Sequence, residues 1–134
     1  MIEFRSVGKT YPDGTVAVAD FSLVAPAEQI TVLVGSSGCG KTTLLRMVNR
    51  MVSPTAGQVL VDGEDVAGLD PVRLRRRIGY GMQEAGLLPH RRVIDNIATV
   101  PRLNGVPKPA AHARARELMD LVGLDVTMAG RYPS

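Results

Sequence analysis

An apolar run that leads into a glycine-rich loop constrains the fold of this chain more than any other feature. Residues 30–34 are apolar or β-branched, and they are followed by Gly-Ser-Ser-Gly-Cys-Gly-Lys-Thr at positions 35–42. An apolar pattern with helical spacing begins directly afterwards, at Leu44. A strand, a G-x-x-x-x-G-K-T loop and a helix in this order are typical of a phosphate-binding loop. The sequence therefore predicts an α/β protein that holds a nucleoside triphosphate.

The residues of this phosphate loop (Gly35–Thr42) each suit the chemistry of a polyphosphate. Glycines allow the backbone to curl so that successive N–H groups converge, and the start of the following helix adds its positive dipole end. Lys41 can reach the β- and γ-phosphates, and the Thr42 hydroxyl can bind Mg²⁺. A ligand-free glycine turn is the alternative, but the Gly-Lys-Thr ending has no packing purpose on a turn. We predict that the nucleotide contacts Ser36, Ser37, Gly38, Cys39, Gly40, Lys41, Thr42 and Thr43.

Composition places the chain among ordinary globular proteins and argues against several other classes. Of 134 residues, 45% are hydrophobic and 22% are charged, with a net charge of +3. The arginines form short clusters with few aromatic residues between them, which indicates solvated helix faces and not a nucleic-acid surface. The start lacks a signal-peptide pattern, and no apolar run approaches the roughly 18 residues of a membrane span. We expect a soluble, cytoplasmic protein.

The single cysteine is Cys39, so no intrachain disulfide can form, which fits a reducing compartment. Its position in a tight turn requires only a small residue. A thiol beside a helix N-terminus is nevertheless expected to react with thiol reagents, and bound nucleotide should protect it.

Periodicity predicts alternating strands and helices. Strands are expected at 2–7, 16–18, 21–24, 30–34, 58–61 and 78–82. Helices are expected from Lys41 to before Ser53 (apolar stripe Leu44, Leu45, Val48 and Met51), at 71–77 with Asp70 as N-cap, at 93–100, and at 109–122 with Gly123 as the stop. The N-terminal strands alternate in polarity, which is typical of an antiparallel sheet with one wet face. Residues 30–34 are apolar almost throughout, which is typical of a strand covered on both faces.

Three elements together resemble the nucleotide-binding subunit of an ABC transporter. These are Tyr11 ahead of the phosphate loop, the loop itself, and Gln83 after the predicted strand Ile78–Met82. Within that family, four stretches are similar to importers of quaternary-ammonium osmoprotectants such as glycine betaine, choline, carnitine and proline betaine: Met47–Met51, Val61–Val66, Gly86–His90 and Asp95–Pro101. Methionine, phosphate and polar amino-acid importers share much of this pattern and remain alternatives.

The resemblance implies further roles and partners. Tyr11 would stack on the adenine ring, and Gln83 would act in catalysis beside Lys41 and join Thr42 in binding Mg²⁺. The segment Glu84–Arg92 would receive a coupling helix from the transmembrane permease. A second copy of the ATPase subunit would complete the site, a substrate-binding protein would take part indirectly, and no nucleic acid is involved. The subunit would then lie on the inner face of the cell membrane.

The implied fold is a P-loop NTPase core, a RecA-like parallel sheet with flanking helices, plus an N-terminal antiparallel β subdomain. We expect the β subdomain at about 1–29 and 57–67, the core at about 30–56 and 71–92, and the start of a helical subdomain at about 93–134. Relatives continue into the Leu-Ser-Gly-Gly-Gln signature, the Walker B strand and the switch histidine. This sequence contains none of the three, so we expect it to bind ATP but not to hydrolyse it efficiently, unlike its full-length parent. Residues 30–34 would then expose an apolar edge that favours self-association or a longer chain.

Other P-loop classes are the competing interpretation. A small-molecule kinase, a GTPase or a nucleotide-binding switch would also carry the phosphate loop, although no Asn-Lys-x-Asp guanine-reading motif is present. Of the two histidines, His90 fits a plain loop residue as well as a contact residue, and His112 is expected to be solvated on the polar side of the last helix. Neither has neighbours in the sequence that predict a metal site.

Overall fold

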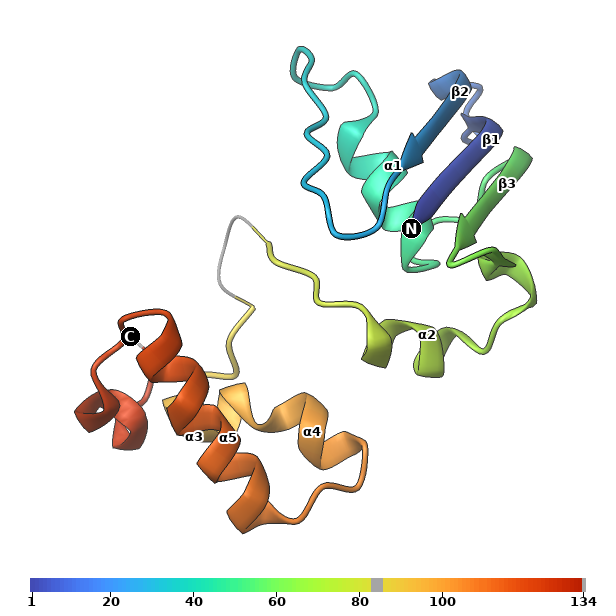
Figure 1. Cartoon of the computed structure of the whole chain (residues 1–134). Coiled ribbons are helices and arrows are strands. Elements are labelled where there is room, and N and C mark those ends of the chain that lie inside the picture. Colours follow the sequence, from blue (N-terminus) through green and yellow to red (C-terminus); the bar gives the residue numbers. More distant parts are fainter. Residues whose placement is uncertain (83–85, 134) are drawn as a thin grey trace. The chain divides into compact units, whose positions relative to one another are not determined.

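A computed structural model describes residues 1–82 and 86–133 of the chain. The chain divides into two compact units, Met1–Gly79 and Tyr80–Ser134, and each is considered by itself (Figure 1). The first unit contains the sheet and the phosphate loop, and the second is helical. The three-part subdivision expected from the family resemblance remains a prediction.

An antiparallel sheet forms one layer of the first unit. Its strands are β1 (Ile2–Thr10), β2 (Val16–Ala25), β3 (Ala56–Val61) and β4 (Glu64–Asp65), in the order β2-β1-β3-β4. In β1, which lies between β2 and β3, Phe4 is paired with Leu23 of β2 on one side and with Val59 of β3 on the other. The register shifts after Phe4, where Ser6 has a positive φ of 44° and its N–H donates to the Ser22 hydroxyl at 2.9 Å. The N-terminal antiparallel sheet predicted from alternation is confirmed, with the two strands expected at 16–24 joined into one.

Helix α1 (Lys41–Val48) lies against this sheet and completes the core of the first unit. Phe4, Val7, Leu44 and Met47 are buried, and the Phe4 ring meets Phe21 edge-on at 5.4 Å between centroids. The predicted apolar stripe is right for Leu44 and Val48 but wrong for Leu45 and Met51, which are 49% and 54% exposed. The helix ends at Val48, so Met51 is not part of its apolar face. Met47 is fully buried in the core instead.

The short helix α2 (Pro71–Arg77) follows the 3₁₀ turn η1 (Val66–Gly68) and begins as its sequence predicts. The Asp70 carboxylate accepts the N–H of Arg73 at 2.8 Å, and Pro71 occupies the first helical position. From α2, the Arg75 guanidinium donates to the carbonyl oxygens of Asn49 and Arg50 at 3.0 and 2.7 Å. These carbonyls lie just beyond the end of α1, so Arg75 joins the two helices.

Two predicted strands are not strands in this structure. Residues 30–34 and 78–82 have no β-ladder partner among the described residues, and Ile30, Val32 and Val34 are 93%, 72% and 88% exposed. A parallel strand is stabilised only when neighbouring strands flank it. The described chain places none beside these segments, so their β propensity alone does not produce a sheet. The expected exposure of the apolar residues at 30–34 is confirmed.

The second unit consists of α3 (Val93–Ile97), α4 (Thr99–Leu103), α5 (Lys108–Leu121) and the 3₁₀ turn η2 (Val126–Gly130). The helix predicted at 109–122 is confirmed within one residue, and Gly123 takes a positive φ of 71° after it. The single helix predicted at 93–100 is instead two helices that meet at Ala98. Pro101 has no N–H for the carbonyl of Ile97, so the helical bonding is interrupted there.

Small apolar residues allow these helices to approach closely. Ile94, Ala98, Ala111, Ala115 and Met119 are buried. None of the helices in the described ranges is both long and apolar enough to cross a membrane.

Candidate functional site

The phosphate loop makes a tight turn between residues 35 and 40 and leads directly into α1. Gly38 and Gly40 have positive φ values of 81° and 95°, a region that favours glycine. At Gly40 the constraint is also steric, because a Cβ atom there would collide with the carbonyl oxygen of Ala17 in β2. Glycine at this position therefore lets the start of α1 lie against the sheet.

The first turn of α1 presents backbone N–H groups without a side-chain cap. Gly40 is the N-cap residue, and no side chain among the described residues accepts a hydrogen bond from this helix start. The first N–H groups of a helix have no partner within the helix, and the dipole makes this end attractive to anions. The start of α1 thus offers backbone donors of the kind to which anionic groups bind.

The Lys41 ammonium folds back over the loop. Its Nζ donates to the carbonyl oxygens of Gly35 and Ser36 at 2.8 and 2.6 Å, and lies 3.4 Å from the sulfur of Cys39. These contacts hold the positive charge at the centre of the turn. Both acceptors are neutral carbonyl oxygens. An anionic oxygen can displace them, because a hydrogen bond from an ammonium to an anion is stronger than one to a neutral oxygen.

A pocket of about 300 Å³ lies between β2 and the phosphate loop. Lys41 and Cys39 form part of its wall, and Ala17, Val18 and Asp20 contribute from the strand. The pocket therefore combines a cationic group and an exposed thiol with one wall from β2, to which Asp20 adds a carboxylate. Cys39 is exposed and, within the described chain, unpaired.

Tyr11 occupies the hairpin between β1 and β2. Its N–H donates to the carbonyl of Thr15 at 2.9 Å, and its carbonyl accepts from the N–H of Gly14 at 2.9 Å. The Asp13 carboxylate accepts the N–H of Thr15, which holds the pKa of Asp13 below its usual range. The Tyr11 ring is partly exposed and lies 5.2 Å from the ammonium of Lys9. The hairpin thus presents an aromatic face on the same unit as the phosphate loop.

The remaining predicted site residues differ in what the structure says of them. Residues 36–43 are brought together at the start of α1. Gln83 and Glu84 lie outside the described residues, so the roles predicted for them stay predictions. Within the described ranges no group of three His, Cys, Asp or Glu side chains could hold a metal ion.

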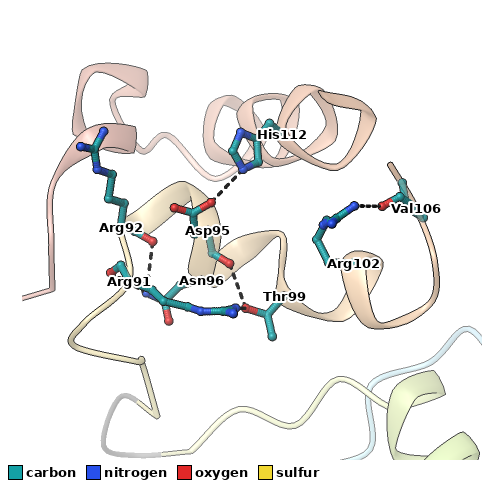
Figure 2. A network of polar contacts seen from close by, with 8 residues as sticks. All are labelled: Arg91, Arg92, Asp95, Asn96, Thr99, Arg102, Val106 and His112. Atoms are coloured by element: carbon teal, nitrogen blue, oxygen red, sulfur yellow. Dashed lines mark hydrogen bonds and ion pairs between the residues drawn. The ribbon is translucent and has the colours of Figure 1, made fainter. Parts of the chain in front are cut away.

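The sequence prediction for His112 is also wrong. Its side chain is only 20% exposed, and its Nε2 lies 2.9 Å from Oδ1 of Asp95, as Figure 2 shows. The prediction of a solvated histidine failed because the partner is 17 residues away on another helix. Only the packing of α3 against α5 brings the two side chains together, and no local sequence signal reports that packing.

Comparison with known proteins identifies the class. The family model described as ABC transporter matches residues 18–132, and the chain belongs to this family. It is 42% identical over 133 residues to the choline transport ATP-binding protein OpuBA of Bacillus subtilis, which covers 99% of this chain and 35% of that protein. It is 46% identical over 118 residues to the osmoprotectant import ATP-binding protein OsmV of Salmonella typhimurium, covering 87% of this chain and 31% of that protein.

Two further comparisons extend this result. The methionine import ATP-binding protein MetN of Caulobacter vibrioides is 42% identical over 138 residues, covering 100% of this chain and 41% of that protein. A dimeric ATP-binding cassette in a post-hydrolysis state, bound to ADP and Pi, superposes with a TM-score of 0.84 at 25% identity, covering 99% of this chain and 62% of that one. The fold class is therefore that of the ABC ATPases. The chain spans about a third of the length of the osmoprotectant relatives.

Proposed function

We propose that this chain is the nucleotide-binding part of the ATP-binding subunit of an ABC importer, and that it holds the polyphosphate of ATP at residues 36–43. The observation that supports this most is the start of α1. There a helix N-terminus without a side-chain cap, two left-handed glycines and the Lys41 ammonium meet in one turn. Backbone donors and a fixed cation in this arrangement suit β- and γ-phosphate oxygens.

In this proposal each residue has a defined task. Lys41 would neutralise charge on the phosphate oxygens, and Thr42 and Gln83 would hold Mg²⁺, which polarises the phosphate when bound; Gln83 would also orient the attacking water. Tyr11 stacks on the adenine ring and supplies on the order of 1 kcal/mol without reading a particular base edge. ATP hydrolysis belongs to the whole subunit, which would couple it to uptake.

For the solute, we propose a quaternary-ammonium osmoprotectant of the glycine betaine, choline or carnitine type. Support comes from relatives at 42% and 46% identity that are named for choline transport and osmoprotectant import. A methionine importer is the second candidate, because the MetN relative matches the full chain at 42% identity. Phosphate and polar amino-acid importers, a P-loop kinase and a nucleotide switch remain the further alternatives.

The partners follow from the same proposal. The segment Glu84–Arg92 would contact the transmembrane permease on the inner face of the cell membrane, and a second copy of the ATPase subunit would face the phosphate loop. A substrate-binding protein would deliver the solute without touching this chain.

Binding and turnover of ATP in the full-length subunit test the proposal. We expect Mg-dependent ATP binding and hydrolysis, with Lys41→Ala lowering the hydrolysis rate at least about 100-fold, because the lost ammonium acts mainly on transition-state charge. Lys41→Arg, which keeps the charge but not the compact ammonium, is the matched control and should recover little. Absence of ATP binding by the unmodified subunit would refute the proposal.

Uptake by the reconstituted importer separates the solutes. Radiolabelled choline and glycine betaine should be taken up in an ATP-dependent manner that Lys41→Ala abolishes. Uptake of methionine in their place would favour the second candidate.

A further inference from the structure

Lys9 makes two contacts that link Tyr11 to a distant part of the chain. Lys9 is half-buried near the end of β1, and its Nζ donates to the Ser53 carbonyl oxygen at 2.7 Å. The same ammonium lies over the Tyr11 ring, 5.2 Å from the ring centre. The Lys9 side chain therefore joins the aromatic residue of the first hairpin to the chain that follows α1.

The carbonyl that accepts from Lys9 belongs to a stretch that is itself held in place. The Thr55 N–H donates to the Gly8 carbonyl at 2.8 Å, and the Thr10 N–H donates to the Thr55 hydroxyl at 3.1 Å. Residues 53–55, which connect α1 to β3, are thus fixed against the end of β1 on both sides of Lys9. Because the acceptor belongs to this stretch, the ammonium has a defined position.

Tyr11 is restrained both at its backbone and at its ring. Its backbone is held by the hydrogen bonds of the hairpin, with Thr15 and Gly14 at 2.9 Å each. Its ring is held by the Lys9 ammonium, because a cation is attracted to the electron-rich face of an aromatic ring. A free tyrosine side chain rotates, and a ligand that binds to it must stop that rotation. A ring that is already held loses less conformational entropy when a ligand stacks on it.

The two faces of the Tyr11 ring are not equivalent. The Lys9 ammonium occupies one face at 5.2 Å from the ring centre. A planar group inserted between the two would need roughly 3.5 Å on each side, which is more than this gap provides. Tyr11 is nevertheless 36% exposed, so part of its surface remains open to a ligand. A base that stacks on the ring is therefore directed to the face away from Lys9.

We propose that Lys9 is a positioning residue for the base of the bound nucleotide: it holds the Tyr11 ring so that the face away from the ammonium receives the adenine. This role rests on the function proposed above, in which Tyr11 stacks on the base. Because stacking reads no particular base edge, Lys9 favours planar purines in general and does not distinguish adenine from guanine. Lys9 acts on the binding of the base alone, and the triphosphate is left to the phosphate loop.

Ligand affinities of the full-length subunit, measured by isothermal titration calorimetry, test this role. Lys9→Met keeps an unbranched apolar side chain but removes the charge and the donor. We expect it to weaken Mg-ATP binding about threefold, because a cation–π contact at a partly exposed site is modest. Mg-tripolyphosphate, which has the phosphates but no base, should bind with unchanged affinity. Lys108→Met is the matched control, since Lys108 is exposed on α5 and undergoes the same charge change; both affinities should stay as they are.

Two further variants separate positioning of the ring from a general structural effect. Lys9→Arg keeps a cation that can both lie over tyrosine and donate to a carbonyl, so Mg-ATP affinity should stay within about 1.5-fold of the unmodified subunit. Tyr11→Leu removes the ring, and in that background Lys9→Met should weaken binding no further, because the two residues act through one contact. In the nucleotide-free subunit, NMR should show an upfield ring-current shift of the Lys9 protons next to Nζ, which Tyr11→Leu abolishes.

Several results would overturn the role of Lys9 while leaving the proposed function intact. Unchanged Mg-ATP affinity in Lys9→Met would exclude it. Equal losses for Mg-ATP and Mg-tripolyphosphate would indicate a contact with the phosphates or a damaged fold, and equal losses in Lys9→Met and Lys108→Met would indicate a general charge effect. An undiminished loss in the Tyr11→Leu background would show that Lys9 acts independently of the ring. Absence of Mg-ATP binding by the unmodified subunit, in contrast, would refute the proposed function and the role of Lys9 with it.

Discussion

Two loops of this molecule each lead into a helix, and they satisfy their backbone groups in opposite ways. The phosphate loop turns around a cation, because Lys41 donates to the carbonyls of Gly35 and Ser36. The segment Leu88–Arg92 turns around a neutral amide, because Asn96 both accepts from and donates to its backbone. In the first loop the group that closes the turn is also the one suited to bind an anion. In the second loop the closing group is the Asn96 amide, which is already hydrogen-bonded to the backbone. The charged side chains of this loop take no part in closing the turn.

The difference indicates what each loop can do when a ligand arrives. An anion at the phosphate loop can replace the carbonyl acceptors of Lys41, so binding there exchanges internal bonds for external ones. A partner at the segment Leu88–Arg92 finds a backbone that is already fixed and adds contacts to side chains. The first loop is suited to a change on binding and the second to a constant surface. The following predictions test that contrast, starting from the largest expected effect.

Substitution of Gly40 by alanine should have the largest effect. The added Cβ would meet the carbonyl oxygen of Ala17, and the φ of 95° is unfavourable for alanine, so we expect a loss of about 2–4 kcal/mol in the free energy of unfolding. ATP affinity should also fall at least about tenfold, because the loop amides move. Urea denaturation and fluorescent-nucleotide binding measure the two effects. Gly68→Ala is the control, since Gly68 has open space around it and should change stability by under about 0.5 kcal/mol.

Substitution of Asn96 by alanine should have an intermediate effect confined to the second loop. Loss of the bonds to a partly exposed backbone should lower stability by about 1–2 kcal/mol and leave ATP affinity unchanged. Amide hydrogen exchange should accelerate at Leu88, whose N–H loses its acceptor. Asn104→Ala, at an exposed asparagine just after α4, is the comparison and should be nearly neutral. A change of ATP affinity in Asn96→Ala would show that the two loops are not independent.

Chemical modification of Cys39 should show a smaller effect, but it reports directly on the exchange of hydrogen bonds proposed for Lys41. The Cys39 thiol is exposed and lies 3.4 Å from the Lys41 ammonium. A ligand that displaces the ammonium or covers the turn therefore alters the accessibility of the thiol. We expect Mg-ATP to slow modification by a maleimide at least about threefold, followed by mass spectrometry. In Lys41→Ala the protection should disappear. Equal rates with and without nucleotide in the unmodified protein would count against a nucleotide at this turn.

The hairpin that holds Tyr11 should show the smallest effect, and it depends on pH. The Asp13 carboxylate accepts the Thr15 N–H, which lowers its pKa in the folded state below the unfolded value. This contribution to stability is therefore complete above the unfolded pKa and is lost as the pH falls through the folded pKa. NMR titration of Asp13 should give a pKa below that of a model peptide. Because the group is exposed, Asp13→Asn should barely change global stability at neutral pH.

Features with local causes were predictable from the sequence. The N-cap of α2 follows from Asp70 and Pro71, and the end of α5 follows from Gly123, because a single residue sets each geometry. The phosphate loop followed from its spacing, since glycines and a lysine at those positions leave few conformations. The membership in the ABC transporter family was likewise predictable from motifs, and the family comparison confirmed it.

Features with distant causes were not predictable. The apolar run at 30–34 looked like a covered strand, but a parallel strand depends on neighbours that no local pattern supplies. The pairing of His112 with Asp95 depends on the packing of two helices. The role of Asn96 also escaped prediction, because an asparagine near a helix start gives no sign of which backbone groups its amide will bind.

The attachment of α1 at both ends has a mechanical consequence. At its start Gly40 packs closely against the Ala17 carbonyl. Beyond its end, Arg75 donates hydrogen bonds to the carbonyls of Asn49 and Arg50. Eight helical residues make a rod about 12 Å long, too short to bend appreciably. A displacement at the start of α1 would therefore be passed along the helix to the hydrogen bonds of Arg75, so that a rearrangement at the phosphate loop also bears on α2.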